Sequence, residues 1–199
     1  MGDYTADGET ETGTPRPLLI GDPARDLQVS QFRPSGFAET IAGRRFSAHN
    51  QSAQAFSVAL TTTYTGLVLS CPIGSGVNLI LTGAGLALSV APAAIASAHL
   101  IGTWSPSVDT VHTTPVTPRC NILGAAAPVG KVDLAATIVT PFYLEPLMSG
   151  FTAAALPSSP MVGRDINGRW IITPGGAIAI GVLTAVTGFG WLEWIEVPA

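Results

Sequence analysis

The chain has 199 residues, of which 47% are hydrophobic and 11% are charged, and its formal net charge is −4. This hydrophobic content is that of a folded globular protein, but the charge is less than half of the roughly 25% that typical soluble domains carry. Lys131 is the single lysine and the sequence has no basic stripe, which argues against nucleic acid as a partner.

The first 48 residues differ in composition from the rest, because 12 of the 22 charged residues lie within the first 45 positions. Four prolines interrupt this stretch, so no long helix or strand can run through it. We expect residues 1–48 to form an extended arm that docks on the body or on a neighbouring subunit, with a free tail as the alternative. Its apolar residues are the candidate contacts, among them Leu18, Leu19, Ile20, Phe32 and Phe37.

The first residues, MGDYTADGETETG, are acidic and polar, unlike the basic and apolar regions of a secretory signal peptide. The segment from Phe46 to Val108 contains no Asp, Glu, Lys or Arg. Its apolar runs are short and broken by Gly, Pro, Ser and Thr, whereas a spanning helix needs about 20 consecutive apolar residues. We therefore expect a buried sheet and no membrane partner.

Residues 49–199 read as a body of short strands separated by turns, because apolar residues recur with a period near two. The 22 glycines and 16 prolines favour such an arrangement. Strands are predicted over residues 56–60, 66–70, 78–90, 95–104, 119–123, 134–139, 142–148, 169–173, 177–185 and 189–197. This spacing predicts an all-β, jelly-roll-like sandwich preceded by the extended N-terminal arm.

The last predicted strand carries apolar side chains on both faces. Trp191, Ile195 and Val197 fall on one face with Glu193, and Leu192, Trp194 and Glu196 fall on the other. A strand that is apolar on both sides is covered on both sides, here by the second sheet and by the arm or another subunit. Trp191 and Trp194 are therefore candidate interface residues.

Residues able to carry out chemistry are few in the body. Asp109 and His112 stand three positions apart on a proline-flanked loop, but no third ligand or nucleophile accompanies them. Ser75 lies in a Gly-Ser-Gly turn that does not match the nucleophile elbow. Cys71 and Cys120 are read as small buried residues without a disulfide. We expect no enzyme activity, no catalytic residue, no metal site and no cofactor.

Three segments carry a resemblance: TPRPLLIGDPARD in the arm, HTTPVTPRCNILG in the middle and PGGAIAIGVLTAVTGFGWLEWIEVP at the end. Together they resemble structural proteins of tailed phages, and more loosely the trimeric sandwiches of the TNF and C1q kind. The resemblance implies a jelly-roll virion protein that assembles as a homotrimer or other symmetric oligomer in the host cytoplasm. Its expected partners are copies of itself, the major capsid protein and other virion proteins.

Three functions remain open from the sequence. The first is a capsid decoration or cement protein that stabilises the head through its arm and one face of the sandwich. The second is a fibre, spike or head–neck component that binds a host receptor through the loops 105–118 and 164–169, with Trp104 and Arg169 as contact residues. The third, a hydrolase that uses Asp109 and His112, is the least favoured.

Overall fold

The structure, a computed structural model, describes residues 20–21, 27–28, 36–58, 60–151 and 161–199. It divides into two compact units, Met1–Phe37 and Ala38–Ala199. In the first unit, strand β1 (Ile20–Gly21) pairs antiparallel with strand β2 (Leu27–Gln28). Three of the predicted arm contacts, Leu18, Leu19 and Phe32, lie outside the described residues.

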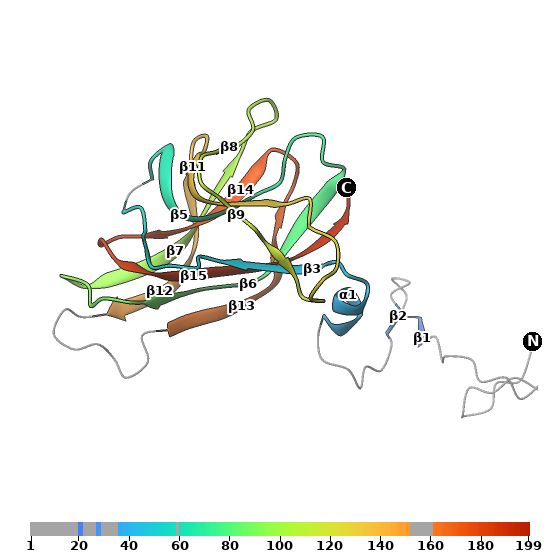
Figure 1. Cartoon of the computed structure of the whole chain (residues 1–199), viewed down its shortest axis with the longest axis horizontal. Coiled ribbons are helices and arrows are strands. Elements are labelled where there is room, and N and C mark those ends of the chain that lie inside the picture. The colour runs from blue at the N-terminus through green and yellow to red at the C-terminus, as the bar shows by residue number, and fades with distance from the viewer. Residues whose placement is uncertain (1–19, 22–26, 29–35, 59, 152–160) are drawn as a thin grey trace, which may run out of the picture. The chain divides into compact units, whose positions relative to one another are not determined.

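The second unit is built from two antiparallel sheets, and Figure 1 shows the strands of the first sheet side by side. The first sheet has the order β10-β3-β15-β6-β13, and β4 pairs with β15 at its side. Its strands are β3 (Arg45–His49), β4 (Gln54–Ala55), β6 (Val77–Leu88), β10 (Arg119–Cys120), β13 (Met161–Ile172) and β15 (Thr187–Pro198).

The second sheet has the order β12-β7-β14-β5-β11-β8, and β9 pairs with β11. Its strands are β5 (Thr63–Ser70), β7 (Ala96–Trp104), β8 (Val111–His112), β9 (Pro115–Val116), β11 (Lys131–Thr137), β12 (Phe142–Phe151) and β14 (Gly176–Val182). Apolar side chains from both sheets meet between them and form the larger core. The predicted all-β sandwich is confirmed.

Eight of the strands have the order of a jelly roll. Taken along the chain, β3, β5, β6, β7, β12, β13, β14 and β15 are the first to the eighth strand. One sheet then reads first, eighth, third, sixth, and the other reads second, seventh, fourth, fifth. This is the arrangement of two interleaved Greek keys. Strand β11 is an addition, because it lies outside the eight and extends the second sheet beyond β5.

Strand β15 shows the predicted alternation of side chains. Leu192, Trp194 and Glu196 point into the molecule and are buried, whereas the residues between them are partly exposed. Trp194 is fully buried and its ring centroid lies 6.0 Å from that of Phe46. Trp194 is therefore a core residue of this fold and offers no surface to a partner.

The boundary between arm and body falls earlier than residue 48. Strand β3 belongs to the sandwich, because it pairs with β15 from Trp191 to Ile195 and contributes Phe46 and Ala48 to the core. A short helix, α1 (Phe37–Ile41), precedes it, and an Arg44–Glu39 ion pair of 2.7 Å accompanies it. Phe37, a predicted arm contact, is half-buried at the start of this helix. No helix among the described residues has the length and apolar character to cross a membrane.

Candidate functional site

An apolar cleft opens on the side of the sandwich where both sheets end. Strand β12 is the last strand of one sheet and β13 the last strand of the other. Between them lies a cavity of about 240 Å³, whose floor is formed by β7 and β14. None of its lining residues is charged. We call this cavity the β12–β13 cleft.

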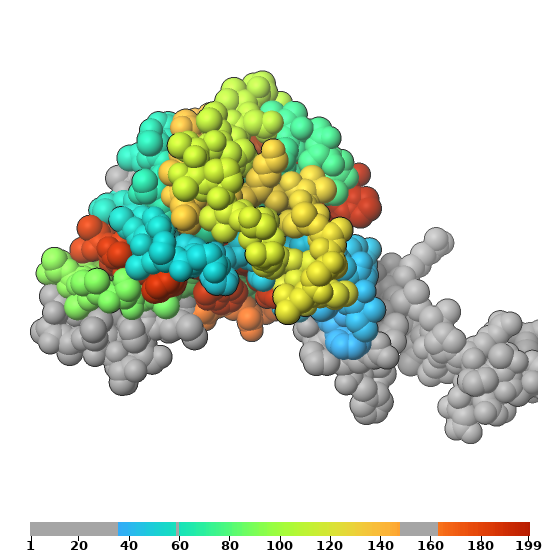
Figure 2. All heavy atoms as spheres, in the orientation of Figure 1, coloured from blue at the N-terminus to red at the C-terminus, as the bar shows by residue number. Residues whose placement is uncertain are grey.

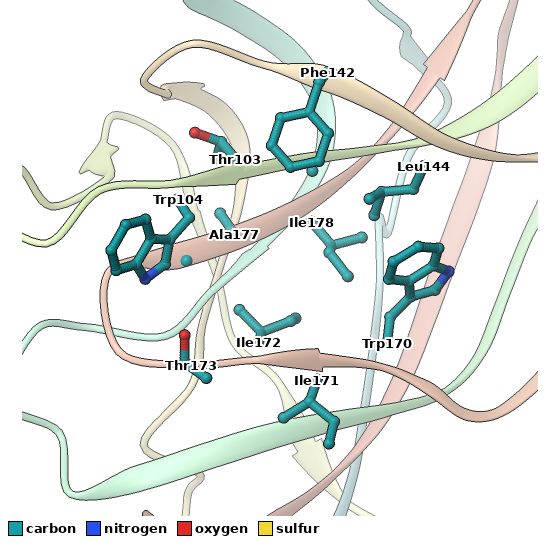
Figure 3. Close-up of a pocket in the computed structure, with 12 residues that line it drawn as sticks. Thr103, Trp104, Phe142, Leu144, Trp170, Ile171, Ile172, Thr173, Ala177 and Ile178 are labelled. Atoms are coloured by element: carbon teal, nitrogen blue, oxygen red, sulfur yellow. The ribbon is translucent and has the colours of Figure 1, made fainter.

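Large apolar side chains surround the mouth of this cleft, as Figure 3 shows. Phe142 lies on one rim and Ile172 on the other, Ile171 points from β13 away from the cavity, and Trp104 and Trp170 stand at opposite ends. Trp104 is 55% exposed, Phe142 is 49% exposed and Ile171 is 57% exposed. Trp104 and Phe142 thus leave apolar surface accessible beside an uncharged cavity, and Ile171 adds apolar surface on the other side of β13.

Polar contacts join β12 to β13 beside the cleft. The Glu145 carboxylate accepts a hydrogen bond of 3.0 Å from the Trp170 indole and is also bonded to Arg169. Arg164 donates to the Pro146 carbonyl at 3.1 Å. Residues 164–169 were expected to form a loop, but they lie within strand β13, where Asn167 and Gly168 adopt positive φ angles in a bulge. The side chains of Arg164 and Arg169 therefore connect the edge strand β13 to the edge strand β12.

The opposite side of the sandwich carries two adjoining cavities around strand β9. One has a volume of about 340 Å³ and is lined by residues that include His112, Lys131 and Asp133. The other, of about 450 Å³, is lined by residues that include His49 and Arg119. Pro115 and Val116 line both cavities. Together they form what we call the β9 groove, and Figure 2 shows its yellow-green segment beside the cyan segment that follows β3.

His112 takes part in a buried polar network instead of pairing with Asp109. Its Nδ1 contacts the Asp133 carboxylate, and its Nε2 lies 3.3 Å from the Ser70 hydroxyl. The other Asp133 oxygen accepts the Thr114 amide at 3.1 Å. Asp109 lies elsewhere and accepts a hydrogen bond of 2.8 Å from the backbone amide of Ile73. The sequence could not suggest the Asp133 partnership, because the fold joins residues from three different strands.

The order serine, histidine, aspartate is that of a nucleophile triad, but the surroundings of Ser70 differ from those of a reactive serine. Ser70 is 2% exposed and is the last residue of β5, an inner strand of the second sheet. The next amide, that of Cys71, donates to the Gly176 carbonyl and is not available to an oxyanion. We interpret the network as a polar clamp between β8, β11 and β5. Among the described residues, no three metal-binding side chains gather.

The remaining candidate residues have structural surroundings. Trp191 lies on the outer face of the first sheet, where a Cβ at Gly83 or Gly163 would come within 2.7 or 2.9 Å of its ring. Cys71 and Cys120 are buried and unpaired with each other, as predicted. Burial raises the pKa of the Cys71 thiol, which lowers its reactivity.

Next to Trp191, a bidentate ion pair of 2.8 Å joins Arg45 to Glu193 and raises the pKa of the guanidinium. Asn121 donates a further hydrogen bond of 2.8 Å to the same carboxylate. Arg45 and Glu193, on this face of the sheet, are therefore paired with each other.

Comparison of the chain with protein-family models, with curated proteins and with solved structures finds no match.

Proposed function

We propose that this chain is a structural subunit of a larger particle, a capsid decoration or cement protein of the kind that the resemblance to tailed-phage proteins implies. The observation that carries the proposal is the β12–β13 cleft, with Trp104 and Phe142 about half exposed beside an uncharged cavity and Ile171 about half exposed on the adjoining strand β13. The jelly-roll architecture supports it, because viral capsid proteins use this architecture repeatedly, as lectins also do.

Covering the cleft would stabilise a complex. Fully burying a large apolar side chain contributes about 1.5–3 kcal/mol, and each of these three side chains retains roughly half of its surface to bury. A contact that covers all three would therefore gain roughly 3 kcal/mol from these groups before the cost of association. The low charge of the chain points the same way, because subunit contacts are poorer in charged residues than free surfaces.

The recognition alternative, a fibre or spike module, draws on one of the same residues. Trp104 is exposed at the cleft and is available to a host receptor. Arg169, the other predicted receptor contact, is engaged by Glu145 and helps to join β12 to β13. The structural function accounts for the apolar rim as a whole, so we prefer it.

The mass of the purified protein in solution, measured by light scattering, tests the proposal. We expect a closed oligomer, with a mass that is a multiple of the 20.4 kDa chain. The double variant Trp104→Ser, Phe142→Ser should dissociate toward the monomer, because it removes the apolar rim of the cleft. Leu123→Ser is the matched control, since Leu123 is 88% exposed but lies away from the cleft lining.

A wild-type protein that stays monomeric over a wide range of concentrations would contradict self-association through the cleft. If such a monomer bound host cells, and lost that binding when Trp104 was replaced, the recognition alternative would take precedence. An oligomer that the double variant leaves intact would show that a different surface holds the subunits together.

A further inference from the structure

The β9 groove holds the cations that the described part of the chain leaves without an acidic partner. Arg44, Arg45, Arg164 and Arg169 each form an ion pair with a glutamate. Among the described residues, the two remaining cations are Arg119 and Lys131, and neither forms an ion pair. Both side chains are exposed, and they line the two cavities that meet at Pro115 and Val116.

The surface of the groove is therefore positive in a protein whose net charge is −4. One carboxylate lines it, that of Asp133, but this residue is 1% exposed. Its oxygens are occupied by His112 and by the Thr114 amide. His49, which is exposed at the second cavity, adds a ring that can donate a hydrogen bond.

We infer that the β9 groove of one copy binds the acidic N-terminal segment of a second copy. The chain begins with a stretch of 13 residues that contains Asp3, Asp7, Glu9 and Glu11 and no lysine or arginine. Its charge complements that of the groove, and complementary charge favours encounter and register more than raw affinity. The inference rests on the proposed assembly function, because its occupant is another subunit.

The groove suits a polypeptide better than a nucleic acid. Binding to nucleic acid draws its affinity from many phosphate contacts, and this groove offers two cations on either side of an apolar strand. Pro115, Val116 and Pro118 give the apolar surface against which an extended chain can lie between its carboxylates.

The single lysine makes a sharp test possible. A water-soluble carbodiimide activates a carboxylate, the Lys131 amine attacks the activated carbonyl, and an amide bond forms as the urea leaves. The experiment uses the full-length protein as an equal mixture of ¹⁴N- and ¹⁵N-labelled copies. We expect mass spectrometry to find Lys131 joined to a carboxylate of residues 3–11, with mixed-isotope products that identify links between copies.

The matched variants separate a specific site from general charge. Arg119→Gln should lower the yield of the link about two- to fivefold, the range expected for one exposed ion pair. Arg44→Gln, which removes a cation outside the groove, should leave the yield unchanged. Raising the salt concentration from about 0.05 M to 0.5 M should also lower the yield, because exposed charges are screened.

Three outcomes would overturn the inference. The first is that Lys131 reacts with an acetylating reagent, so that its amine is accessible, but forms no link to residues 3–11. The second is a link found solely within single copies. The third is protection of Lys131 by a single-stranded oligonucleotide and not by a synthetic peptide of residues 1–13. An intact oligomer without this link would refute the inference and leave the assembly function standing.

Discussion

Gly175 occupies a turn between β13 and β14 that no other residue fits. Its φ angle is +83°, and a Cβ at this position would lie 2.0 Å from the carbonyl oxygen of Ser105. Its amide donates to the Cys71 carbonyl at 2.8 Å and its own carbonyl accepts the Ser105 amide at 3.0 Å. The turn therefore joins three loops at one end of the sandwich, and it cannot move away from a new side chain without breaking these bonds.

We predict that Gly175→Ala lowers the free energy of unfolding by more than about 3 kcal/mol, because left-handed backbone strain and a backbone clash add together. Gly74→Ala is the matched control. Gly74 has a similar φ of +72°, but no atom lies within 4 Å of the added Cβ, so the strain of about 1–2 kcal/mol acts without a clash. Urea unfolding monitored by tryptophan fluorescence measures both. Equal losses in the two variants would contradict this account.

Single residues also show what the sequence can and cannot reveal about a site. The period of two predicted the alternation of strand β15 correctly, but it gave the same weight to Trp191 and Trp194, of which one is half-buried and the other is fully buried. Trp104 was expected as a receptor contact, and its side chain is exposed, but the apolar cleft beside it could not be predicted, because the cleft depends on where β7 ends against β12 and β13. The Ser70–His112 contact likewise depends on strand order.

At the scale of elements, strands were predictable where the apolar pattern is regular and were missed where polar residues interrupt it. The predicted 95–104 strand is β7, which covers Ala96–Trp104. Strand β13 was predicted from residue 169 onward, but it begins at Met161, because a bulge at Asn167 lets the pairing with β6 continue through the charged stretch. Cross-strand pairing and the Glu145 contacts compensate for the lack of alternation there.

Glu145 is the group that joins the edge strands, and its removal should loosen the cleft. We predict that Glu145→Ala costs about 1–3 kcal/mol, because the half-buried Trp170 indole and the guanidinium of Arg169 lose their acceptor. Asp165→Ala, an exposed acid on the same strand β13, should change the stability by less than about 0.5 kcal/mol.

Thermal unfolding together with amide hydrogen exchange in β12 and β13 distinguishes Glu145→Ala from Asp165→Ala. Glu145→Ala should show faster amide exchange that is confined to these edge strands. Unchanged exchange in both variants would mean that backbone contacts, and not Glu145, hold the cleft in place.

For the whole molecule, the sequence was sufficient to predict an all-β sandwich but not the position at which the body begins. Prolines and charges in the first 45 residues suggested an arm that ends at residue 48. The two consecutive charged residues Arg44 and Arg45 made the start of β3 unrecognisable in the sequence. In the structure, Arg45 pairs with Glu193 on the outer face of the sheet, while Phe46 enters the core. The fold places Glu193 beside Arg45, and this ion pair makes a charged residue compatible with the start of a strand.

This boundary leads to a prediction about truncation. Removing residues 1–37 should leave the sandwich folded, because both sheets and the main core lie within Ala38–Ala199. Removing residues 1–48 should abolish cooperative unfolding, because it deletes β3 up to its last residue, exposes the edge of β15 and takes Phe46 from the core. Loss of a buried phenylalanine side chain costs about 3–5 kcal/mol, a large share of the roughly 5–15 kcal/mol that stabilises a typical domain. Circular dichroism melts of the two truncated proteins provide the comparison. A cooperative transition in the shorter protein at the same temperature as in the longer one would show that β3 is dispensable and that the arm does extend to residue 48.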